Sequence, residues 1–514
     1  MNRLKQLEQL GQSVWLDFIS RELIKQDGIR KLIEDDGIGG MTSNPAIFQK
    51  ALAQGTDYDS DIKKYVEAGL DVGEIFRKLS IKDIQDAADA LKPVYDRTKA
   101  ADGFISIEVS PYIAHETQAT IEEAKSLWQE VARPNLMVKV PGTKEGAPAI
   151  RDLTAAGLNI NVTLLFSQAA YKAVAFAYIE GLEKRPEGDD LSKISSVASF
   201  FVSRIDTMAD DLINKKLQDE PGPQSEVLAK LRGKVAIANA KIAYQMYKEI
   251  FSGPRWEKLA ARGARPQRLL WASTGTKNKD YSDVLYVDTL IGRPTVNTMP
   301  PETMDAFRDH GNPKADTIED DVDGAKKVLA DLAKGGISLD KITDDLVVDG
   351  VAKFAEAADK LYDALAVKRA KILGGALPIV HEGFGEAKKD IDKEIAAANM
   401  RGDARKVWAK DKSAWTGADE DKWLGWTDVV DRELKDVANL KAFAESLAQA
   451  HTSDVVLLGM GGSSLGAEVL RETFGHREGW PNLHVLDSTD PDQIGAVEKA
   501  IKIDSTLFIV SSKS

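Results

Sequence analysis

One lysine lies in a sequence context where lysines are rare. Residues 136–142 read LMVKVPG, so Lys139 falls inside a short apolar run that ends at a Pro-Gly turn. Such a run predicts a buried strand. Burial of an ammonium group is costly and lowers its pKa, and a neutral lysine attacks carbonyl carbons. Lys139 is therefore a candidate Schiff-base residue. The alternative is a lysine whose stem packs at a strand end while its ammonium group reaches water.

Other polar residues fall at the ends of predicted strands. The first seven strands end with Asp17; with Thr42, Ser43 and Asn44; with Glu108; with Lys139; with Asn161 and Thr163; with Ser199, followed by Arg204; and with Ser273, followed by Lys277. A single such residue is more often a hydrogen-bonded polar group at a strand–loop junction. Seven consecutive polar ends instead favour an active site, because catalysis in β/α barrels takes place at the carboxyl ends of the strands.

The residue types fit the chemistry of a Schiff base. Glu108 could act as the general acid and base through a bound water, and Asp17 could accept the proton of a substrate hydroxyl beside a breaking C–C bond. Short neutral side chains suited to sugar hydroxyls are Ser43, Asn44, Asn161, Thr163 and Ser199. Groups suited to a phosphate are Arg204, Ser273 and Lys277. This chemistry needs neither a metal nor a cofactor.

Short apolar runs alternate with helical patterns up to about residue 300. We predict strands at 13–17, 37–42, 104–109, 136–140, 158–163, 195–199, 268–273 and 293–297. We predict helices at 73–91, 117–132, 167–184, 203–217 and 225–251, and a helical segment at 317–366 that could cover one end of the barrel. Eight strand–helix units predict the α/β class and a closed (β/α)8 barrel over residues 1–370.

A second αβ domain is predicted after a Gly- and Pro-rich linker at 371–385. Residues 386–412 have a helical pattern, and strands are expected near 454, 483 and 506. A Gly-rich turn, GMGGSSLGAE at 459–468, follows the first of these strands, and such turns either bind phosphate or allow tight packing. Because the chain stops directly after the strand near 506, we expect this parallel sheet, over 386–514, to be incomplete.

Composition narrows the function classes. The 514 residues carry a net charge of -13, which argues against a general nucleic-acid or anionic-membrane binder. The chain has no cysteine, no signal peptide at its start and no long apolar stretch, which favours a cytoplasmic protein without a membrane span. Its six histidines form no metal-binding pattern. The oligomeric state is not predicted.

Several motifs of the first domain resemble transaldolase in order and spacing. They are TSNPAIF at 42–48, SIEVSP at 106–111, LMVKVPGTKEG at 136–146, GLNINVTLLFS at 157–167, FFVSRID at 200–206 and WASTGTKN at 271–278. The resemblance implies transfer of a dihydroxyacetone unit from sedoheptulose 7-phosphate or fructose 6-phosphate to an aldose phosphate, in the pentose phosphate pathway. It makes Lys139 the Schiff-base residue and Asp17 the proton acceptor in C–C cleavage.

The same resemblance assigns the remaining roles. Glu108 and Thr163 would hold the catalytic water, and Arg204 and Ser273 would bind the phosphate. Many transaldolases have an arginine two residues after this serine, whereas Gly275 stands here, so Lys277 is expected to supply the missing charge. Alternatives are a class I aldolase on the same barrel and a non-catalytic sugar-phosphate sensor.

The second domain resembles glucose-6-phosphate isomerase. By this resemblance the sugar phosphate would contact Gly462, Ser463, Ser512, Lys513 and Ser514. The catalytic residues of that family come later in its sequences, so we expect no isomerase activity in this chain. A longer product would combine transaldolase and isomerase activities, which share fructose 6-phosphate.

Overall fold

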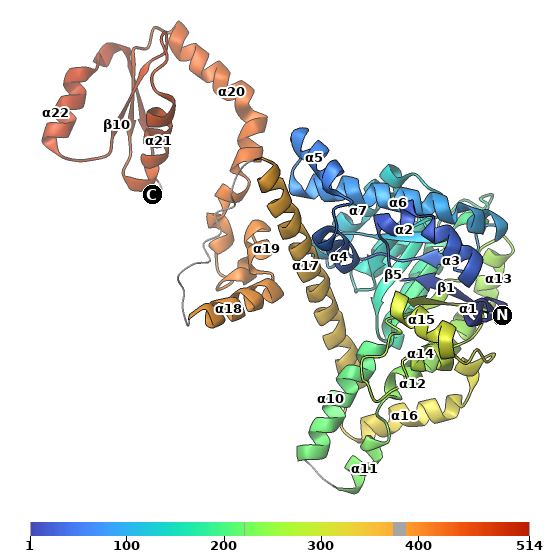
Figure 1. Cartoon of the computed structure of the whole chain (residues 1–514). Helices are drawn as coiled ribbons and strands as arrows, with labels where there is room; N and C mark the ends of the chain where they lie inside the picture. The colour runs from blue at the N-terminus through green and yellow to red at the C-terminus, as the bar shows by residue number, and fades with distance from the viewer. Residues whose placement is uncertain (1, 220–221, 374–386, 513–514) are drawn as a thin grey trace. The chain divides into compact units, whose positions relative to one another are not determined.

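The computed structural model describes residues 2–219, 222–373 and 387–512. The chain divides into two compact units, Met1–Gly402 and Asp403–Ser514 (Figure 1). The predicted linker at 371–385 overlaps the end of the helix α17 (Leu339–Ile372), and most of the linker lies outside the described residues. The domain boundaries therefore stay a prediction.

In the first unit, eight described strands close into a parallel barrel in chain order. They are β1 (Gln12–Leu16), β2 (Gly40–Met41), β3 (Phe104–Glu108), β4 (Leu136–Pro141), β5 (Ile160–Leu165), β6 (Ser196–Phe201), β7 (Arg268–Ala272) and β8 (Thr295–Met299). This confirms the predicted (β/α)8 barrel. The predicted strand β8 began two residues early, and the predicted β2 was longer than the two residues that pair.

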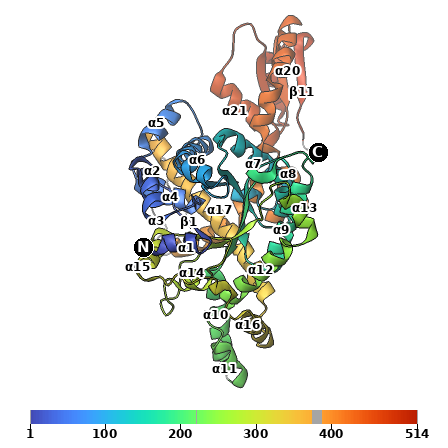
Figure 2. The same ribbon diagram turned by 90° about the vertical axis from the view of Figure 1, so that its right-hand side faces the viewer.

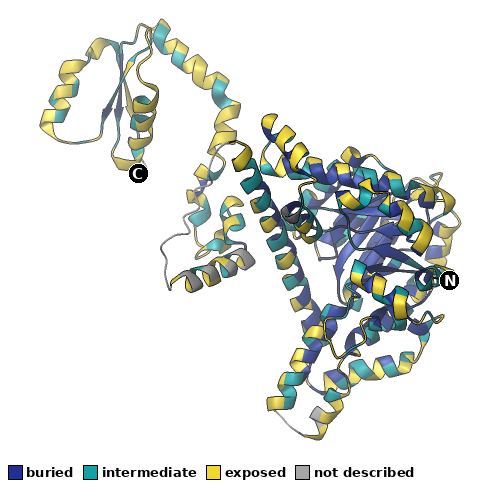
Figure 3. Ribbon diagram, in the orientation of Figure 1, coloured by how far each residue is buried: buried dark blue, intermediate teal, exposed yellow. Residues whose placement is uncertain are grey.

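The barrel strands are buried on both faces, which explains their near-continuous apolar sequences. Every residue of β4, β5, β6 and β8 is buried. Figure 3 shows this as a dark blue barrel beneath helices whose outer faces are yellow. The large side chains Trp15, Phe104, Phe200 and Trp271 are fully buried in the core around the strands.

Helices that precede, connect and follow the strands surround the barrel (Figure 2). They are α1 (Arg3–Gln9), α2 (Arg21–Lys25), α3 (Gly28–Asp36), α4 (Pro45–Gln54), α5 (Asp59–Glu67), α6 (Val72–Arg97), α7 (Thr117–Val131), α8 (Gly146–Ala155), α9 (Gln168–Glu183), α10 (Ser203–Asp219), α11 (Pro223–Ala229), α12 (Val235–Ile250), α13 (Pro254–Ala260), α14 (Leu285–Thr289), α15 (Pro301–His310) and α16 (Val322–Lys334). Short 3₁₀ turns include η1 (Pro111–Ile113) and η3 (Thr317–Glu319).

Two predicted helices are divided at glycines. The segment 225–251 forms α11 and α12, separated by a turn in which Gly233 has φ +69°. The segment 317–366 forms η3, α16 and α17, and Gly336 between the two helices has φ +75°. A glycine in the left-handed conformation ends a helix at little steric cost. The helical sequence pattern continues across both glycines, so the predicted helices extended past the observed breaks.

Helix α17 lies across the carboxyl end of the barrel. It contacts α4, α6, α10 and η1, which follow or flank the carboxyl ends of barrel strands, and it contacts β5 directly. Its buried residues recur every three or four positions, from Ile342 through Gly350 and Phe354 to Leu365. This confirms the predicted helical cover at one end of the barrel.

The second unit contains a three-stranded parallel sheet in the order β10–β9–β11. Its strands are β9 (Asp454–Leu458), β10 (Asn482–Leu486) and β11 (Thr506–Val510). The described α-helices of this unit are α19 (Asp403–Trp408), α20 (Val429–Gln449), α21 (Leu465–Phe474) and α22 (Pro491–Ala500), whereas α18 (Lys388–Arg401) belongs to the first unit. The strands β10 and β11 lie on opposite sides of β9 and parallel to it, so the strand order reverses at the carboxyl end of this central strand.

Candidate active site

The strand register brings three predicted site residues together. Glu108 of β3 pairs with Lys139 of β4, and Lys139 pairs with Asn161 of β5. Paired residues on adjacent parallel strands face the same side of the sheet, and residues two apart on one strand share that side. Because Asn161 is hydrogen-bonded to Ser106 of β3 and Ser199 of β6, this common side is the barrel interior.

Lys139 is buried, with 5% of its surface exposed. Its Nζ donates a hydrogen bond to the backbone oxygen of Ser43 at 3.1 Å and lies 3.4 Å from Glu108 Oε2. The ring of Phe354, from α17, has its centroid 6.0 Å from Nζ. The amine therefore lies at the carboxyl end of the barrel, near the carboxyl group of Glu108 and near an aromatic ring from the covering helix.

Glu108 is the carboxyl group nearest to this amine, and its side chain is 6% exposed. Burial raises its pKa, the charge of Lys139 opposes this shift, and the charge of Asp17 adds to it. Apart from the ion pair with Lys139, Oε2 has no hydrogen-bond partner among the described residues. A carboxyl group with a raised pKa retains its proton more readily than an exposed one, which suits a general acid and base.

A polar network crosses the barrel interior beside Lys139. Asn161 Nδ2 donates to Ser106 Oγ at 3.0 Å, and Ser199 Oγ donates to Asn161 Oδ1 at 2.7 Å. Thr163 lies two residues beyond Asn161, within a register shift between Val162 and Leu165 of β5, and the next residue, Leu164, adopts φ +58°. Thr163 Oγ1 is buried without a hydrogen-bond partner among the described residues. It is thus available to a substrate or water, whereas Asn161 and Ser199 are mainly engaged with each other.

Asp17 follows β1 directly and is half-buried. Its backbone N–H donates to the carbonyl oxygen of Met299, and Thr42 Oγ1 donates to Asp17 Oδ1 at 2.6 Å. Of the residues after β2, Ser43 donates its hydroxyl to the backbone oxygen of Ser106, and Asn44 accepts from Ile47 N as the N-cap of α4. These bonds fix the backbone of the loop after β2, in which the Ser43 carbonyl oxygen accepts the hydrogen bond from Lys139 Nζ.

Ser273 contacts the start of α10, where Arg204 follows Ser203. Ser203, the first residue of this helix, hydrogen-bonds Ser273 through both hydroxyl groups at 3.0 Å and through its backbone N–H. Arg204 lies over the ring of Phe201, and its Nη1 is buried without a hydrogen-bond partner among the described residues. Burial lowers its pKa, and the charges of Asp349 and Asp17 oppose that shift. A guanidinium group, hydroxyls and a helix N-terminus together suit an anion.

Lys277 is exposed in the loop after β7. A side chain at Gly275 would begin 3.1 Å from Thr303 Oγ1, which restricts what this position accommodates. The expected replacement of the missing arginine by Lys277 stays a prediction.

Helix α17 contributes site residues that the sequence did not single out. Phe354 faces Lys139, Asp349 influences Arg204, and an added Cβ at Gly350 would lie 2.8 Å from Leu164 Cδ2 of β5. The helical pattern at 317–366 signalled a cover, but no motif indicated which of its residues enter the site. The sequence indicated Thr42 only as a strand-end residue and did not predict its hydrogen bond to Asp17.

The second unit has its own cavity at the carboxyl ends of its three strands, with a volume of about 620 Å³. Gly462, Ser463 and Ser512 of the predicted phosphate-binding set line it, together with Ser488 and Thr489 after β10. Lys513 and Ser514 lie outside the described residues. Open parallel sheets bind ligands at such a switch in strand order.

Among the described residues, no group of three or more His, Asp or Glu side chains is arranged to hold a metal ion. None of the described helices is both long and apolar enough to cross a bilayer.

Two protein-family models match this chain. The model of the transaldolase/fructose-6-phosphate aldolase family matches residues 14–365, and that of the phosphoglucose isomerase family matches residues 427–514. Transaldolase 2 of a Nostoc species is 48% identical over 374 residues, which are 72% of this chain and 98% of the relative. Transaldolase of Trichodesmium erythraeum is 49% identical over 377 residues, with 72% and 98% covered. Transaldolase of Thermobifida fusca is 45% identical over 364 residues, with 71% and 97% covered.

Proposed function

Because this chain belongs to the transaldolase/fructose-6-phosphate aldolase family, we propose that its barrel transfers a dihydroxyacetone unit from a ketose phosphate to an aldose phosphate through a Schiff base on Lys139. The donors are sedoheptulose 7-phosphate or fructose 6-phosphate, and the reaction belongs to the pentose phosphate pathway. The observation that carries the proposal is the buried Lys139 amine 3.4 Å from the Glu108 carboxyl group at the carboxyl end of the barrel.

The first step forms the Schiff base. Lys139 Nζ attacks C2 of the ketose and forms a carbinolamine, whose hydroxyl must leave as water. Glu108 supplies the proton for this departure through a water that Thr163 Oγ1 also contacts. The raised pKa of Glu108 supports this role, since a carboxyl group that retains its proton can act as an acid. Hydrolysis at the end of the cycle reverses the same proton transfer.

The second step breaks the bond between C3 and C4. Asp17 accepts the proton of the C4 hydroxyl, the C3–C4 electron pair moves toward the protonated imine, and the aldose phosphate leaves. The three-carbon enamine stays bound to Lys139 until a second aldose phosphate is attacked by C3, and Asp17 then returns its proton to the new hydroxyl. Atoms and electrons balance without a redox partner, and the order of events is ping-pong.

Arg204, Ser273 and the N-terminus of α10 bind the phosphate of donor and acceptor. Two features support this role: the Arg204 Nη1 without a hydrogen-bond partner and the serine pair beside it. Asn44, Asn161 and Ser199 then contact the sugar hydroxyls. Lys277 contacts the phosphate only in a conformation of the loop after β7 that brings its ammonium group to Arg204 and Ser273.

A class I aldolase that releases free dihydroxyacetone is the second candidate, because the matching family includes fructose-6-phosphate aldolases. An assay with fructose 6-phosphate, with and without erythrose 4-phosphate, separates the two. A transaldolase forms sedoheptulose 7-phosphate and glyceraldehyde 3-phosphate only with the acceptor. Equal release of glyceraldehyde 3-phosphate without the acceptor would identify the aldolase, and absence of turnover would favour a sugar-phosphate sensor.

For the second unit we propose sugar-phosphate binding at the ends of β9, β10 and β11. The cavity lined by Ser463 and Ser512 supports this, as does the match to phosphoglucose isomerase. Calorimetric titration of Lys139→Arg with glucose 6-phosphate tests it: Ser463→Ala should weaken a binding event that Ser453→Ala, at the opposite end of β9, leaves unchanged. We place the protein in the cytoplasm, consistent with its lack of cysteine.

A further inference from the structure

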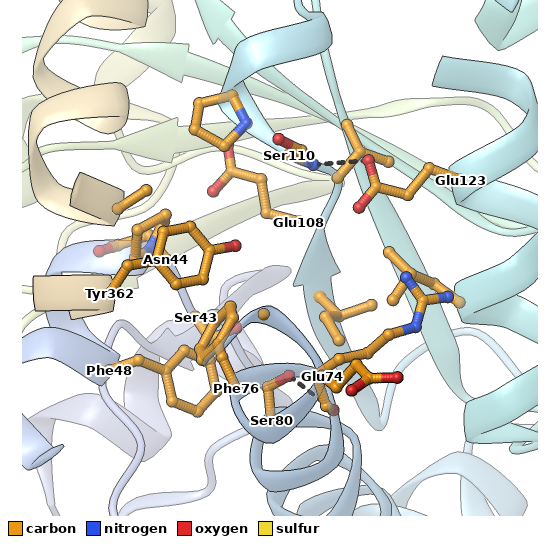
Figure 4. Close-up of a pocket in the computed structure, with 18 of the residues that line it drawn as sticks. Ser43, Asn44, Phe48, Glu74, Phe76, Ser80, Glu108, Ser110, Glu123 and Tyr362 are labelled. Atoms are coloured by element: carbon orange, nitrogen blue, oxygen red, sulfur yellow. Dashed lines mark hydrogen bonds between the residues drawn. The ribbon is translucent and has the colours of Figure 1, made fainter. Parts of the chain in front are cut away.

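A second cavity lies in the barrel unit, beside the candidate active site. Its volume is about 380 Å³, and its walls come from α4, α6, α7, α17 and the loop after β3. It shares Ser43, Asn44 and Glu108 with the candidate active site, whereas Lys139, Thr163 and Arg204 are not among its lining residues. Figure 4 shows rings on the left of this cavity, the Glu123 side chain on the right and Glu108 between them.

The apolar wall is a chain of three aromatic rings. Phe48 and Phe76 meet edge to face with centroids 5.7 Å apart, and Phe76 and Tyr362 meet in the same way at 5.8 Å. Pro45, Ile107 and Leu127 complete the apolar surface. Aromatic rings attract cations through their negative faces, and they also bury apolar groups.

The polar side of the cavity is acidic. Glu123 accepts a hydrogen bond from the backbone N–H of Ser110 at 3.0 Å, and burial raises the pKa of Glu123. Glu108 presents a 6% exposed side chain whose Oε2 lies 3.4 Å from Lys139 Nζ and has no further hydrogen-bond partner among the described residues. These two carboxyl groups therefore border a largely apolar space.

The other charged groups of the cavity are already engaged. Asp71 and Glu74 form the capping box at the start of α6. Arg77, the one guanidinium group that lines the cavity among the described residues, is bound to Glu130 and Ser126. A cation inside the cavity would thus face two carboxyl groups, of which only Glu108 has a cationic partner, Lys139, on its other side, and it would favour the ionised form of both.

We propose that this cavity binds a small organic cation with an apolar body, such as a substituted ammonium ion, between the aromatic wall and the Glu108 and Glu123 carboxyl groups. Binding stabilises the ionised form of Glu108 and so withdraws the proton that the Lys139 chemistry uses. The binding itself stands apart from the proposed function, whereas the resulting inhibition rests on it.

Titration calorimetry of the full chain with choline tests the binding, with 3,3-dimethylbutan-1-ol as the neutral analogue of the same shape. Because a quaternary ammonium ion has no N–H, it cannot form an imine with the carbonyl group of a sugar substrate, so binding is measured without side reactions. We expect choline to bind about five- to tenfold more tightly than the alcohol, in line with a cation–π contact and a carboxylate partner. Equal affinity of the two, or no choline binding at millimolar concentration, would overturn the proposal.

Two variants place the ligand. Glu123→Gln keeps the shape of the side chain and should weaken choline binding at least about fivefold, without changing that of the alcohol. Glu122→Gln is the matched control, because Glu122 is exposed on the same helix and outside the cavity. Tyr362→Leu should weaken choline binding further. Choline binding that survives both cavity variants would show that the ion binds elsewhere and contradict the proposal.

A kinetic measurement tests the consequence. Choline should lower kcat with fructose 6-phosphate and erythrose 4-phosphate and leave KM nearly unchanged, and Glu123→Gln should relieve this inhibition. If the chain proves inactive while choline binds as described, the proposed function fails and the cation site stands. If the enzyme is active and choline binds the cavity without effect on kcat, the inhibitory role is contradicted.

Discussion

The buried Asp206 makes stability depend on pH in a way that one substitution can remove. Asp206 lies on α10, is 1% exposed, and accepts hydrogen bonds from the Ala236 backbone N–H at 2.8 Å and from the Tyr286 hydroxyl at 2.9 Å. Burial raises its pKa from 3.8 to about 7, and the two hydrogen bonds only partly oppose this shift. At a pH between these two pKa values, the folded state therefore holds a proton on Asp206 that the unfolded chain has lost.

The sign and the size of the pH effect on stability follow from the difference between the folded and unfolded pKa of Asp206. Asp206 contributes full stability below pH 4, and that contribution is lost as the pH rises to about 7, beyond which the fold must bury a carboxylate. Between pH 5 and pH 8 the loss is about 3 kcal/mol, at about 1.4 kcal/mol for each pH unit below the folded pKa. For a unit of about 400 residues the unfolding entropy is about 0.8 kcal/mol/K, so the loss lowers Tm by about 3 °C.

The assay compares Tm of the wild type and Asp206→Asn at pH 5 and pH 8 by scanning calorimetry. Asparagine keeps an oxygen for the Ala236 N–H and carries no charge, so the variant should lack about 3 °C of the pH-dependent fall in Tm. Asp211→Asn, at an exposed position on the same helix, is the control and should keep the full fall. An unchanged pH dependence in Asp206→Asn would refute the buried-proton explanation.

Three further substitutions test the catalytic roles. Glu108→Gln should lower kcat by about 10²- to 10⁴-fold with little change in KM, as expected for loss of a general acid, and a loss below tenfold would exclude that role. Arg204→Lys should raise KM for fructose 6-phosphate by about 10-fold or more, because a bidentate phosphate contact is lost, while activity toward unphosphorylated fructose stays the same. Equal effects on both sugars would point to misfolding. Thr163→Val should slow single-turnover Schiff-base formation by about tenfold, because the water loses one hydrogen-bond partner, and a wild-type rate would remove Thr163 from the water site.

Local patterns in the sequence were sufficient for the barrel. Each predicted strand overlaps an observed one, because fully buried parallel strands have apolar runs that stand out from amphipathic helices. Parallel register then brings Glu108, Lys139 and Asn161 level, so strand-end residues that are distant in sequence meet in space. The two matched families also confirm the resemblances to transaldolase and to glucose-6-phosphate isomerase that the motifs indicated.

Long-range packing could not be predicted in the same way. Phe354 lies 215 positions after Lys139 in the chain, and only the path of α17 over the barrel brings its ring near the amine. The division of the helical segments at Gly233 and Gly336 depends on left-handed backbone conformations that a helical hydrophobic pattern does not register. Lys277 shows the limit for flexible charged residues, since a loop position after a strand does not fix where a long side chain points.

The central claim is the Schiff base on Lys139, and borohydride reduction with fructose 6-phosphate followed by peptide mass spectrometry tests it most directly. We predict a reduced three-carbon adduct on the peptide that contains Lys139, and none in Lys139→Arg. The three-carbon mass would also show that the dihydroxyacetone unit stays bound after the aldose phosphate leaves. A folded wild-type protein that forms no adduct, or that forms it on another lysine, would contradict the mechanism.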